Sequence, residues 1–388
     1  MLKSVRSLVL PFLTVMMQSS KNNHIWDIFT DIPDNRTKLR NEYRKSIDLI
    51  VKNDYYKSGR GLPLPDFYYT KEVTMDIGNL INALPGALAQ GLIWGIMAIG
   101  VYITFRILDI ADLSVDGTMC TGGAVCIMLM QNGWNVWAAI AAAFGAGLLV
   151  GLMTGVFHTA MGIPAILAGI LTQLGLWSIN LKIMGKSNQA INVDKYDLLV
   201  SLRYVRNVAA YKNTILVVAI FVVVIIAVLY WFFGTELGCS LRATGCNPNM
   251  ARAQGINTNF NKVLGLMLSN GLVSLSSALL AQYQGFADIN MGKGAIVIGL
   301  AAVIIGEAIF GKIFKNFALS LLAVAFGAII YYIVIQTVLW LGIDPDLLKL
   351  LSALVVAVFL AIPFWKGKYF TRAKRVAVEE ANDGKEAM

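Results

Sequence analysis

Long apolar runs alternate with short polar stretches along the chain from residue 75 onward. Each run approaches the length of about 20 residues that an α-helix needs to cross the hydrocarbon core of a bilayer. The strand alternation typical of outer-membrane barrels is absent. The pattern predicts an all-α polytopic membrane protein with about nine transmembrane segments, within a range of about eight to ten. The predicted spans are residues 81–104, 115–131, 136–158, 165–184, 214–234, 262–284, 294–310, 317–340 and 347–365. The segment 115–131 is short and contains Gly117, Gly122 and Gly123, so a broken or only partly spanning segment is the alternative there.

The polar stretch before these spans has two explanations. Residues 1–74 mix charged and aromatic residues without a period, and their one apolar run is too short to span a membrane. Lys71-Glu72-Val73 can be encoded by AAGGAGGT, a strong bacterial ribosome-binding sequence, at a suitable distance before Met75. We expect Met75 to be the true initiator, and the alternative is a real but poorly ordered extension. The nucleotide sequence of these codons decides between the two.

The composition supports a membrane protein and argues against other classes. The chain is 57% hydrophobic and 14% charged, whereas soluble domains carry about a quarter charged residues. Its net charge of +9 lies in loops and tails beside the spans, so it indicates orientation in the membrane and not nucleic-acid binding. The four cysteines are expected to be reduced thiols.

Signals of catalysis and of cofactor binding are missing. The two histidines cannot form a metal site with these cysteines at any usual spacing. The only Gly-Lys-Ser, at residues 185–187, has Asn180 where the upstream glycine of a phosphate-binding loop would lie. We therefore expect no metal, no cofactor and no enzymatic activity in this chain.

Charges beside the spans predict how the chain crosses the membrane. The tail, residues 367–388, follows the last span through a basic stretch, which places it in the cytoplasm. Alternation then places the loop 235–261 in the cytoplasm and the loop 185–213 outside. The net charge of this outer loop, about +3, argues for the opposite side. The chain thus divides into an extension, 1–74, a transmembrane domain, 75–366, and the charged tail.

A weak internal repeat divides the transmembrane domain. "IADLSVDGTMCTGGAVCI" from Ile110 resembles "FADINMGKGAIVIGLAAVI" from Phe286, and each follows an apolar span. Each half has four spans with similar spacing, counted from 81 and from 262. Because the single span at 214–234 lies between them, the two halves would cross the membrane in opposite orientations. Inverted repeats are common in transporters, with the substrate path at the repeat interface. Chance similarity of two short strings is the alternative.

A compact polar insert, "LRATGCNPNMARAQGIN" at residues 241–257, interrupts the apolar pattern. Asn247 is a favourable N-cap, Pro248 suits the first helical position, and Gly255 suits the left-handed residue after a helix end. Residues 248–254 are therefore predicted to form a helix of about two turns, roughly 10 Å long.

Glycines on both sides of this short helix would allow sharp turns, at Gly245 and at Gly255. A short, capped helix on the cytoplasmic side is suited to transmit the movement of a partner to the spans at 214–234 and 262–284. The alternative is an ordinary loop that happens to have favourable caps.

The insert and the helix after it resemble a known family. "TELGCSLRATGCNPNMARAQGINTNFNKVLGLMLSNGLVSLSSALLAQYQG" is similar to the cytoplasmic loop and following helix of ABC-importer permeases of the branched-chain amino acid and ribose type. "DLSVDG" at 112–117 and "IPAILAGILTQLGL" from Ile163 resemble two further family blocks, and the resemblance covers residues 80–365. The branch linked to aromatic amino acid uptake looks most similar, although "LSVDGTM" departs from its "LTVDGSF". The matching loop positions are Thr235, Leu237, Gly238, Ala243, Gly245, Asn247, Ala251, Arg252, Gly255 and Ile256.

The resemblance implies a permease subunit in the cell membrane that moves an amino acid. Its expected assembly is a permease homodimer, with two ATPase subunits inside and a substrate-binding protein outside. The insert helix would be the coupling helix that sits in a groove of the ATPase. The residues that the resemblance assigns to this coupling are Gly245, Asn247, Pro248, Ala251, Arg252 and Gly255.

The basic outer loop has a use in such an assembly. Lys195, Arg203 and Arg206 would pair with acidic residues on the binding protein. Charge complementarity of this kind speeds and orients docking. The alternative is a solvated loop without a partner.

Polar side chains at membrane depth are candidates for the translocation path. Three of them, Asn270, Ser274 and Ser277, have the spacing i, i+4 and i+7, which places them on one helix face. The alternative is interhelical hydrogen bonding without contact to the solute. Glu307, the only acid within a predicted span after residue 117, is either a gate or a side chain that reaches the interface. The full set of path candidates is Gln173, Asn180, Asn270, Ser274 and Ser277.

Two other functions stay open. A secondary transporter driven by an ion gradient would need paired intramembrane carboxylates, and only Glu307 is available. An intramembrane enzyme would need a nucleophile with its base, or a metal constellation, and the sequence has neither. The sequence therefore favours an ABC permease without naming its solute.

Overall fold

The structure is a computed structural model that describes residues 77–193, 195–196, 198–205, 213–311, 313–314, 316–341, 350, 352–354, 356–358 and 361. Some of the sequence predictions fall outside these residues. They concern the extension 1–74 with its start at Met75, Arg206, most of the predicted span 347–365 and the tail 367–388.

The described chain is almost entirely helical, with one small two-stranded sheet. In chain order its elements are α3 (Ile77–Tyr102), the π-helical turn η4 (Ile103–Ile107), α4 (Val115–Gln131), α5 (Val136–Thr159), α6 (Ala165–Met184), β1 (Asn188–Ala190), the 3-10 turn η5 (Leu202–Val205), α7 (Thr214–Gly234), α8 (Glu236–Cys246), α9 (Pro248–Ala253), α10 (Thr258–Gln284), β2 (Phe286–Asp288), α11 (Ala295–Phe310) and α12 (Phe317–Trp340).

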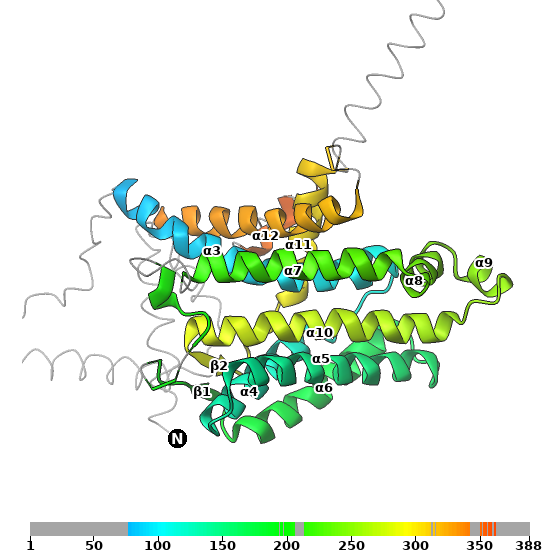
Figure 1. The fold of residues 1–388 in the computed structure, drawn as a ribbon, viewed down its shortest axis with the longest axis horizontal. Helices are drawn as coiled ribbons and strands as arrows, with labels where there is room; N and C mark the ends of the chain where they lie inside the picture. Colours follow the sequence, from blue (N-terminus) through cyan, green and yellow to red (C-terminus); the bar gives the residue numbers. More distant parts are fainter. Residues whose placement is uncertain are drawn as a thin grey trace, which may run out of the picture. The chain divides into compact units, whose positions relative to one another are not determined.

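The long helices give the bundle two distinct ends. In Figure 1 the axes of α5, α7 and α10 lie roughly parallel across the view, with α8 and α9 at one end and the strands β1 and β2 at the other. We call these the α9 end and the strand end. The charge pattern predicts the loops 235–261 and 185–213 on opposite sides of the membrane. The first loop and the described part of the second lie at these opposite ends.

The count of nine membrane spans is not confirmed. Six helices among the described residues are long and apolar enough to cross a membrane, and Ala295–Phe310 is a shorter apolar helix. The predicted spans 115–131 and 294–310 correspond to α4 and α11, which have 17 and 16 residues. At about 1.5 Å per residue each is roughly 25 Å long, which is less than the hydrocarbon thickness of about 30 Å.

The helix α4 is short because it begins inside the bundle. After η4 the chain returns to the interior without helical structure over residues 108–114. Asp112 of this segment is 3% exposed and bonds to Asn270, which lies near the middle of α10. Hydropathy counts apolar residues but does not show where the chain re-enters the bundle. The shortness of 115–131 and its glycines favour a broken or partly spanning segment, which agrees with this short helix.

The first helix of each predicted repeat packs on the third helix of the other. α10 lies along α5, and α3 lies along α12. Glycines allow both close approaches, since a Cβ at Gly91 would lie 2.7 Å from the Cα of Ile329. Gly147 and Gly151 of α5 face the backbone of α10 in the same way. Small residues thus set how near these helices come, as in other membrane bundles.

The helix α7 exposes apolar side chains in several directions. Val223 is 62% exposed and Trp231 is 71% exposed, and 17% of the most apolar part of the helix is buried. In water such a surface would be an interaction or aggregation site, whereas in hydrocarbon it is favourable. The exposed surface of α7 therefore fits contact with lipid.

The strands β1 and β2 form an antiparallel pair at the strand end. Asn188 lies opposite Asp288, and Ala190 lies opposite Phe286. The pair joins the predicted outer loop to the connection between α10 and α11.

Candidate functional site

The polar insert forms the short helix α9 with the caps that its sequence predicts. The Asn247 side chain accepts hydrogen bonds from the backbone N–H groups of Asn249 and Met250, each at 3.1 Å. Pro248 occupies the first turn, and Gly255 after the helix has a φ of 78°. The helix ends one residue earlier than predicted. Its two ends are thus fixed by local hydrogen bonding and backbone geometry.

One face of α9 is held by the rest of the protein and the other is open. Ala251 is 3% exposed, and Arg252 Nε donates to the Thr258 hydroxyl at 2.9 Å. The opposite face, by contrast, presents exposed side chains at the α9 end, with Met250 at 63% exposure. These exposed residues are Asn249, Met250, Ala253 and Gln254.

The prediction that Gly245 forms a sharp turn is wrong. Gly245 lies inside α8, a helix whose N-cap is Thr235. A Cβ at Gly245 would overlap the carbonyl oxygen of Ile107 and would lie 2.9 Å from the Cα of Leu108. A glycine in a sequence indicates a turn or a close approach of two backbones, and here the close approach requires it.

This contact seats α8 directly on the π-helical end of α3. Ile107 is the last residue of η4, and Leu108 begins the non-helical segment that re-enters the bundle. π-Helical turns within α-helices are frequent at functional sites. The short helix α9 is therefore linked, through α8, to the segment that leads to the start of α4.

A buried polar network lies where this segment meets α10. Asp112 Oδ1 accepts from the backbone N–H of Ser114 at 2.9 Å and from its hydroxyl at 2.6 Å. Asp112 Oδ2 accepts from Asn270 Nδ2 at 2.7 Å, and Asn270 Oδ1 accepts from the Thr118 hydroxyl at 2.6 Å. All four side chains are at most 3% exposed. Buried polar groups need such partners, and together these bonds fix α4 against α10.

A second carboxylate joins the starts of the two short helices. Asp116 lies in the first turn of α4 and accepts from the backbone N–H groups of Gly294 at 2.9 Å and Ile296 at 3.0 Å, at the start of α11. A carboxylate is favourable beside a helix N-terminus, and Asp116 serves two of them. Neither Asp112 nor Asp116 was among the predicted site residues, although both lie in the quoted "DLSVDG". An acid within an apolar stretch was the available signal.

The three predicted path residues on α10 are buried and bonded to neighbouring helices. Asn270 belongs to the network with Asp112. The Ser274 hydroxyl donates to the carbonyl oxygen of Ala143, and the Ser277 hydroxyl donates to that of Met119. In this structure they act as interhelical hydrogen-bonding groups, and their part in transport stays a prediction.

The two predicted path residues on α6 differ in their surroundings. Gln173 is partly exposed. Asn180 is 1% exposed, and its Nδ2 donates to the carbonyl oxygen of Gly117 at 3.3 Å. The structure does not bring these two residues together with the three on α10, so the five candidates form no single site.

Glu307 forms an ion pair near the end of α11. Its Oε1 accepts from Arg106 Nε of η4 at 2.9 Å, and the two side chains are 36% and 60% exposed. Exposed pairs of this kind contribute about 1 kcal/mol or less to stability. The pair nevertheless connects the end of α3 to α11, next to the seat of α8 on η4.

The basic residues of the predicted outer loop lie at the strand end. Lys195 is exposed, and its Nζ lies 5.5 Å from the centroid of the Tyr196 ring. Arg203 is exposed in η5, and Arg206 lies outside the described residues. Among the residues that the structure describes, no three His, Cys, Asp or Glu side chains gather in a group that could hold a metal ion.

Comparisons with known proteins agree on one family. The family model described as "Branched-chain amino acid transport system / permease component" matches residues 84–362. A tyrosine transport system permease protein of Clostridioides difficile is 38% identical over 72% of this chain and 91% of its own length. An uncharacterised protein of Rickettsia prowazekii is 36% identical over 72% of this chain and 98% of its own length. The ribose import permease protein of Escherichia coli is 26% identical over 58% of this chain and 69% of its own length.

The family model and the structure describe the same part of the chain. The matched residues 84–362 begin within α3 and include the other long apolar helices that the structure describes, together with α8 and α9. A match over most of a chain, with relatives above 30% identity that it covers almost fully, identifies a shared family. This multi-pass membrane protein therefore belongs to the family of branched-chain amino acid transport system permease components.

Proposed function

We propose that the chain is the transmembrane permease subunit of an ABC importer for an amino acid. An extracytoplasmic binding protein delivers the solute at the strand end, and separate ATPase subunits bind at the α9 end. The observation that carries this proposal is α9 itself, a helix capped at both ends that presents an open face at one end of the bundle. The solute class is supported by the relative named for tyrosine transport, which is more similar than the sugar permeases.

The ATPase is proposed to bind the exposed face of α9. Its movement would be transmitted as a rigid-body shift of α9 and α8, because Gly245 lets α8 contact the backbone at Ile107 directly. From there the segment 108–114 leads to the Asp112 network and the start of α4. ATP and the loaded binding protein favour different conformers of the permease, and this difference in affinity drives alternating access.

The reciprocal packing of the helices supports the proposal of two inverted repeats. In such an arrangement the first helix of each half would cross the third helix of the other, as α3 and α12 do and as α10 and α5 do. The short helices α4 and α11 would be equivalent, and their N-termini meet at Asp116. Transporters built from inverted repeats place discontinuous helices of this kind beside the substrate path.

The remaining partners follow from the same proposal. Lys195, Arg203 and Arg206 would meet acidic residues on the lobes of the binding protein, which would raise the association rate at low ionic strength. Two copies of the chain would join two ATPase subunits. The lipid membrane surrounds the assembly, in agreement with the exposed apolar surface of α7.

Met250→Glu is expected to reduce co-purification of the ATPase subunits by at least tenfold. The new carboxylate would be buried at the interface without a partner, and even the smallest usual effect of such a charge is roughly a factor of ten in affinity. Met250 is 63% exposed on the open face of α9. The measurement is the amount of ATPase retained by the tagged permease after co-expression of the complete transporter.

Met161→Glu is the matched control for this substitution. Met161 is 64% exposed and follows α5, whose end lies beside the start of α10 at the α9 end. It should retain the ATPase at the wild-type level. Equal retention by both variants would contradict the assignment of α9 as the ATPase contact.

A further inference from the structure

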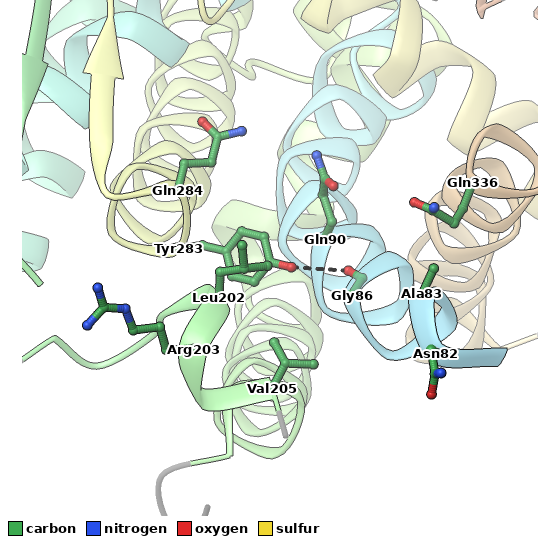
Figure 2. Close-up of a pocket in the computed structure, with 10 residues that line it drawn as sticks. All are labelled: Asn82, Ala83, Gly86, Gln90, Leu202, Arg203, Val205, Tyr283, Gln284 and Gln336. Atoms are coloured by element: carbon green, nitrogen blue, oxygen red, sulfur yellow. Dashed lines mark hydrogen bonds between the residues drawn. The ribbon is translucent and has the colours of Figure 1, made fainter. Parts of the chain in front are cut away.

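A cavity of about 490 Å³ opens at the strand end between α3, η5, α10 and α12. Figure 2 shows the Tyr283 hydroxyl of α10 bonded to Gly86 of α3, with Gln90 of α3 beside them and Gln336 reaching toward α3 from α12. Ligand-binding cavities in proteins have volumes of about 300 to 1,000 Å³. The space is therefore large enough for a small organic solute at the end where the binding protein is proposed to deliver it.

Carboxamide side chains from three different helices line this cavity. They belong to Gln90 of α3, Gln284 at the end of α10 and Gln336 of α12. None of these three amides has a hydrogen-bond partner among the residues that the structure describes. An amide that faces hydrocarbon without a hydrogen-bond partner is strongly unfavourable. Their gathering at one place indicates a surface that faces water and solute and not lipid.

The polar character continues deeper along the same faces of α3 and α12. Trp94 lies one turn beyond Gln90, is 6% exposed, and its Nε1 has no hydrogen-bond partner among the described residues. Its ring lies 5.7 Å from the ring of Tyr332, which lies one turn before Gln336. Buried tryptophan N–H groups usually have a partner. A vacant donor one turn below the amides marks the direction in which a solute would move inward.

The lining chemistry selects a particular class of solute. An amide offers both donors and an acceptor, so it can bond to the carboxylate and to the ammonium group of the same small molecule. Arg203 lies among the lining residues, where its guanidinium suits a carboxylate, and among the described residues that line the cavity there is no acidic side chain. The Tyr283 hydroxyl donates to the carbonyl oxygen of Gly86 at 3.3 Å, which holds its ring in the cavity wall.

We infer that this cavity is a reception site in the permease, which holds a zwitterionic amino acid after the binding protein releases it and before it crosses. The inference rests on the proposed function as an amino acid importer. Gln90 and Gln336 bond to the charged groups of the solute, and the Tyr283 ring contacts its side chain. The Trp94–Tyr332 pair forms the floor that must move to let the solute pass.

The double substitution Gln90→Ala with Gln336→Ala tests this site. The complete transporter is reconstituted in proteoliposomes, and ATP-driven uptake of labelled L-tyrosine is measured with saturating binding protein. Uptake is expected to fall by about tenfold, since a neutral hydrogen bond is worth a factor of roughly 2 to 10. Stimulation of ATP hydrolysis by the docked binding protein should persist, because the docking surface is unchanged.

Asn188→Ala is the control, because it removes a side-chain amide at the strand end but outside the cavity. Asn188 is exposed, lies outside the cavity and donates to the Asp288 carboxylate at 3.2 Å. It should leave uptake unchanged. If the wild type takes up the amino acid, two results would overturn the reception site and leave the proposed function intact. One is wild-type uptake by the double variant, and the other is an equal loss of uptake in the double variant and in Asn188→Ala. Absence of amino acid uptake by the wild type would overturn the proposed function itself.

A thiol at position 336 gives a readout that does not depend on how well the double variant folds. In right-side-out vesicles, Gln336→Cys should react with a membrane-impermeant thiol reagent, while the exposed Cys239 and Cys246 both lie in α8, at the α9 end. Binding protein loaded with L-tyrosine should slow the reaction at least about threefold relative to empty binding protein. Equal rates would show that the solute does not occupy the cavity.

Discussion

Gly245→Ala is expected to lower ATP-driven uptake at least tenfold while the transmembrane bundle remains folded. The added methyl group would overlap the carbonyl oxygen of Ile107 and lie 2.9 Å from the Cα of Leu108, and both neighbours are backbone atoms that cannot rotate away. Forcing extra atoms into such a contact costs about 1 to 3 kcal/mol and moves the elements apart. A free energy of about 1.4 kcal/mol corresponds to a factor of ten. α8 would lose its seat on α3, and the movement of α9 would no longer reach the segment 108–114.

The informative measurement compares uptake and ATP hydrolysis in the same proteoliposomes. For Gly245→Ala the hydrolysis should continue while uptake falls, because the substitution leaves the exposed face of α9 intact. Gly234→Ala is the matched control at the end of α7, since a Cβ there would have no neighbour within 4 Å. Wild-type uptake by Gly245→Ala, or an equal loss in Gly234→Ala, would show that the contact does not transmit movement.

Asn270→Leu is expected to destabilise the protein by about 2 to 4 kcal/mol. The substitution removes the Nδ2 donor that lies 2.7 Å from Asp112 Oδ2 and the Oδ1 acceptor of the Thr118 hydroxyl. Asp112 Oδ2 then loses its hydrogen-bond donor, while the Thr118 hydroxyl keeps its bond to the carbonyl oxygen of Ser114, and both side chains are at most 3% exposed. Leaving such groups without partners is more unfavourable than the bonds themselves are favourable.

Thermal unfolding of the detergent-purified protein measures this loss. A change of about 1 kcal/mol shifts the Tm of a chain of this class by roughly 2 to 4 °C, so a decrease of about 5 to 10 °C is expected. Asn132→Leu, at an exposed asparagine just after α4, should change the Tm little. An unchanged Tm for Asn270→Leu would mean that the network does not hold α4 against α10.

Local features of the fold could be predicted from the sequence because they depend on neighbouring residues. The caps of α9 follow from Asn247, Pro248 and Gly255, which lie within ten positions of one another, and the structure has all three in the predicted roles. The long apolar helices were predicted for the same reason, because each run carries its own signal of length and hydropathy.

Features that depend on distant partners could not be predicted. The partner of Asp112 is 158 positions away in the sequence, and the partners of Asp116 are about as distant. A glycine such as Gly245 is compatible with a turn and with a close contact between two backbones. The position of Ile107 in the structure shows that the close contact is the reason here. The segment 294–310 was counted as a full span because hydropathy does not show where the chain starts α11. For 115–131 the glycines indicated a broken or partly spanning segment, but not its partner on α11.

The cavity at the strand end was missed for a related reason. Gln90, Gln284 and Gln336 lie far apart in the sequence, and each is a single amide at or near an apolar run. The sequence favoured α6 and α10 for the translocation path, because several polar residues cluster along each of these helices. In the structure, the amides without partners come from three helices and line one cavity. The predicted serines of α10 instead form hydrogen bonds to neighbouring helices.

The most direct test of the central claim is the energy source of transport. Proteoliposomes containing the permease, its ATPase subunits and the loaded binding protein should accumulate labelled L-tyrosine only when ATP is present on the ATPase side. A protonophore or a sodium ionophore should leave this uptake unchanged. Uptake by the permease alone, driven by a proton or sodium gradient without ATP, would contradict the account and identify a secondary transporter.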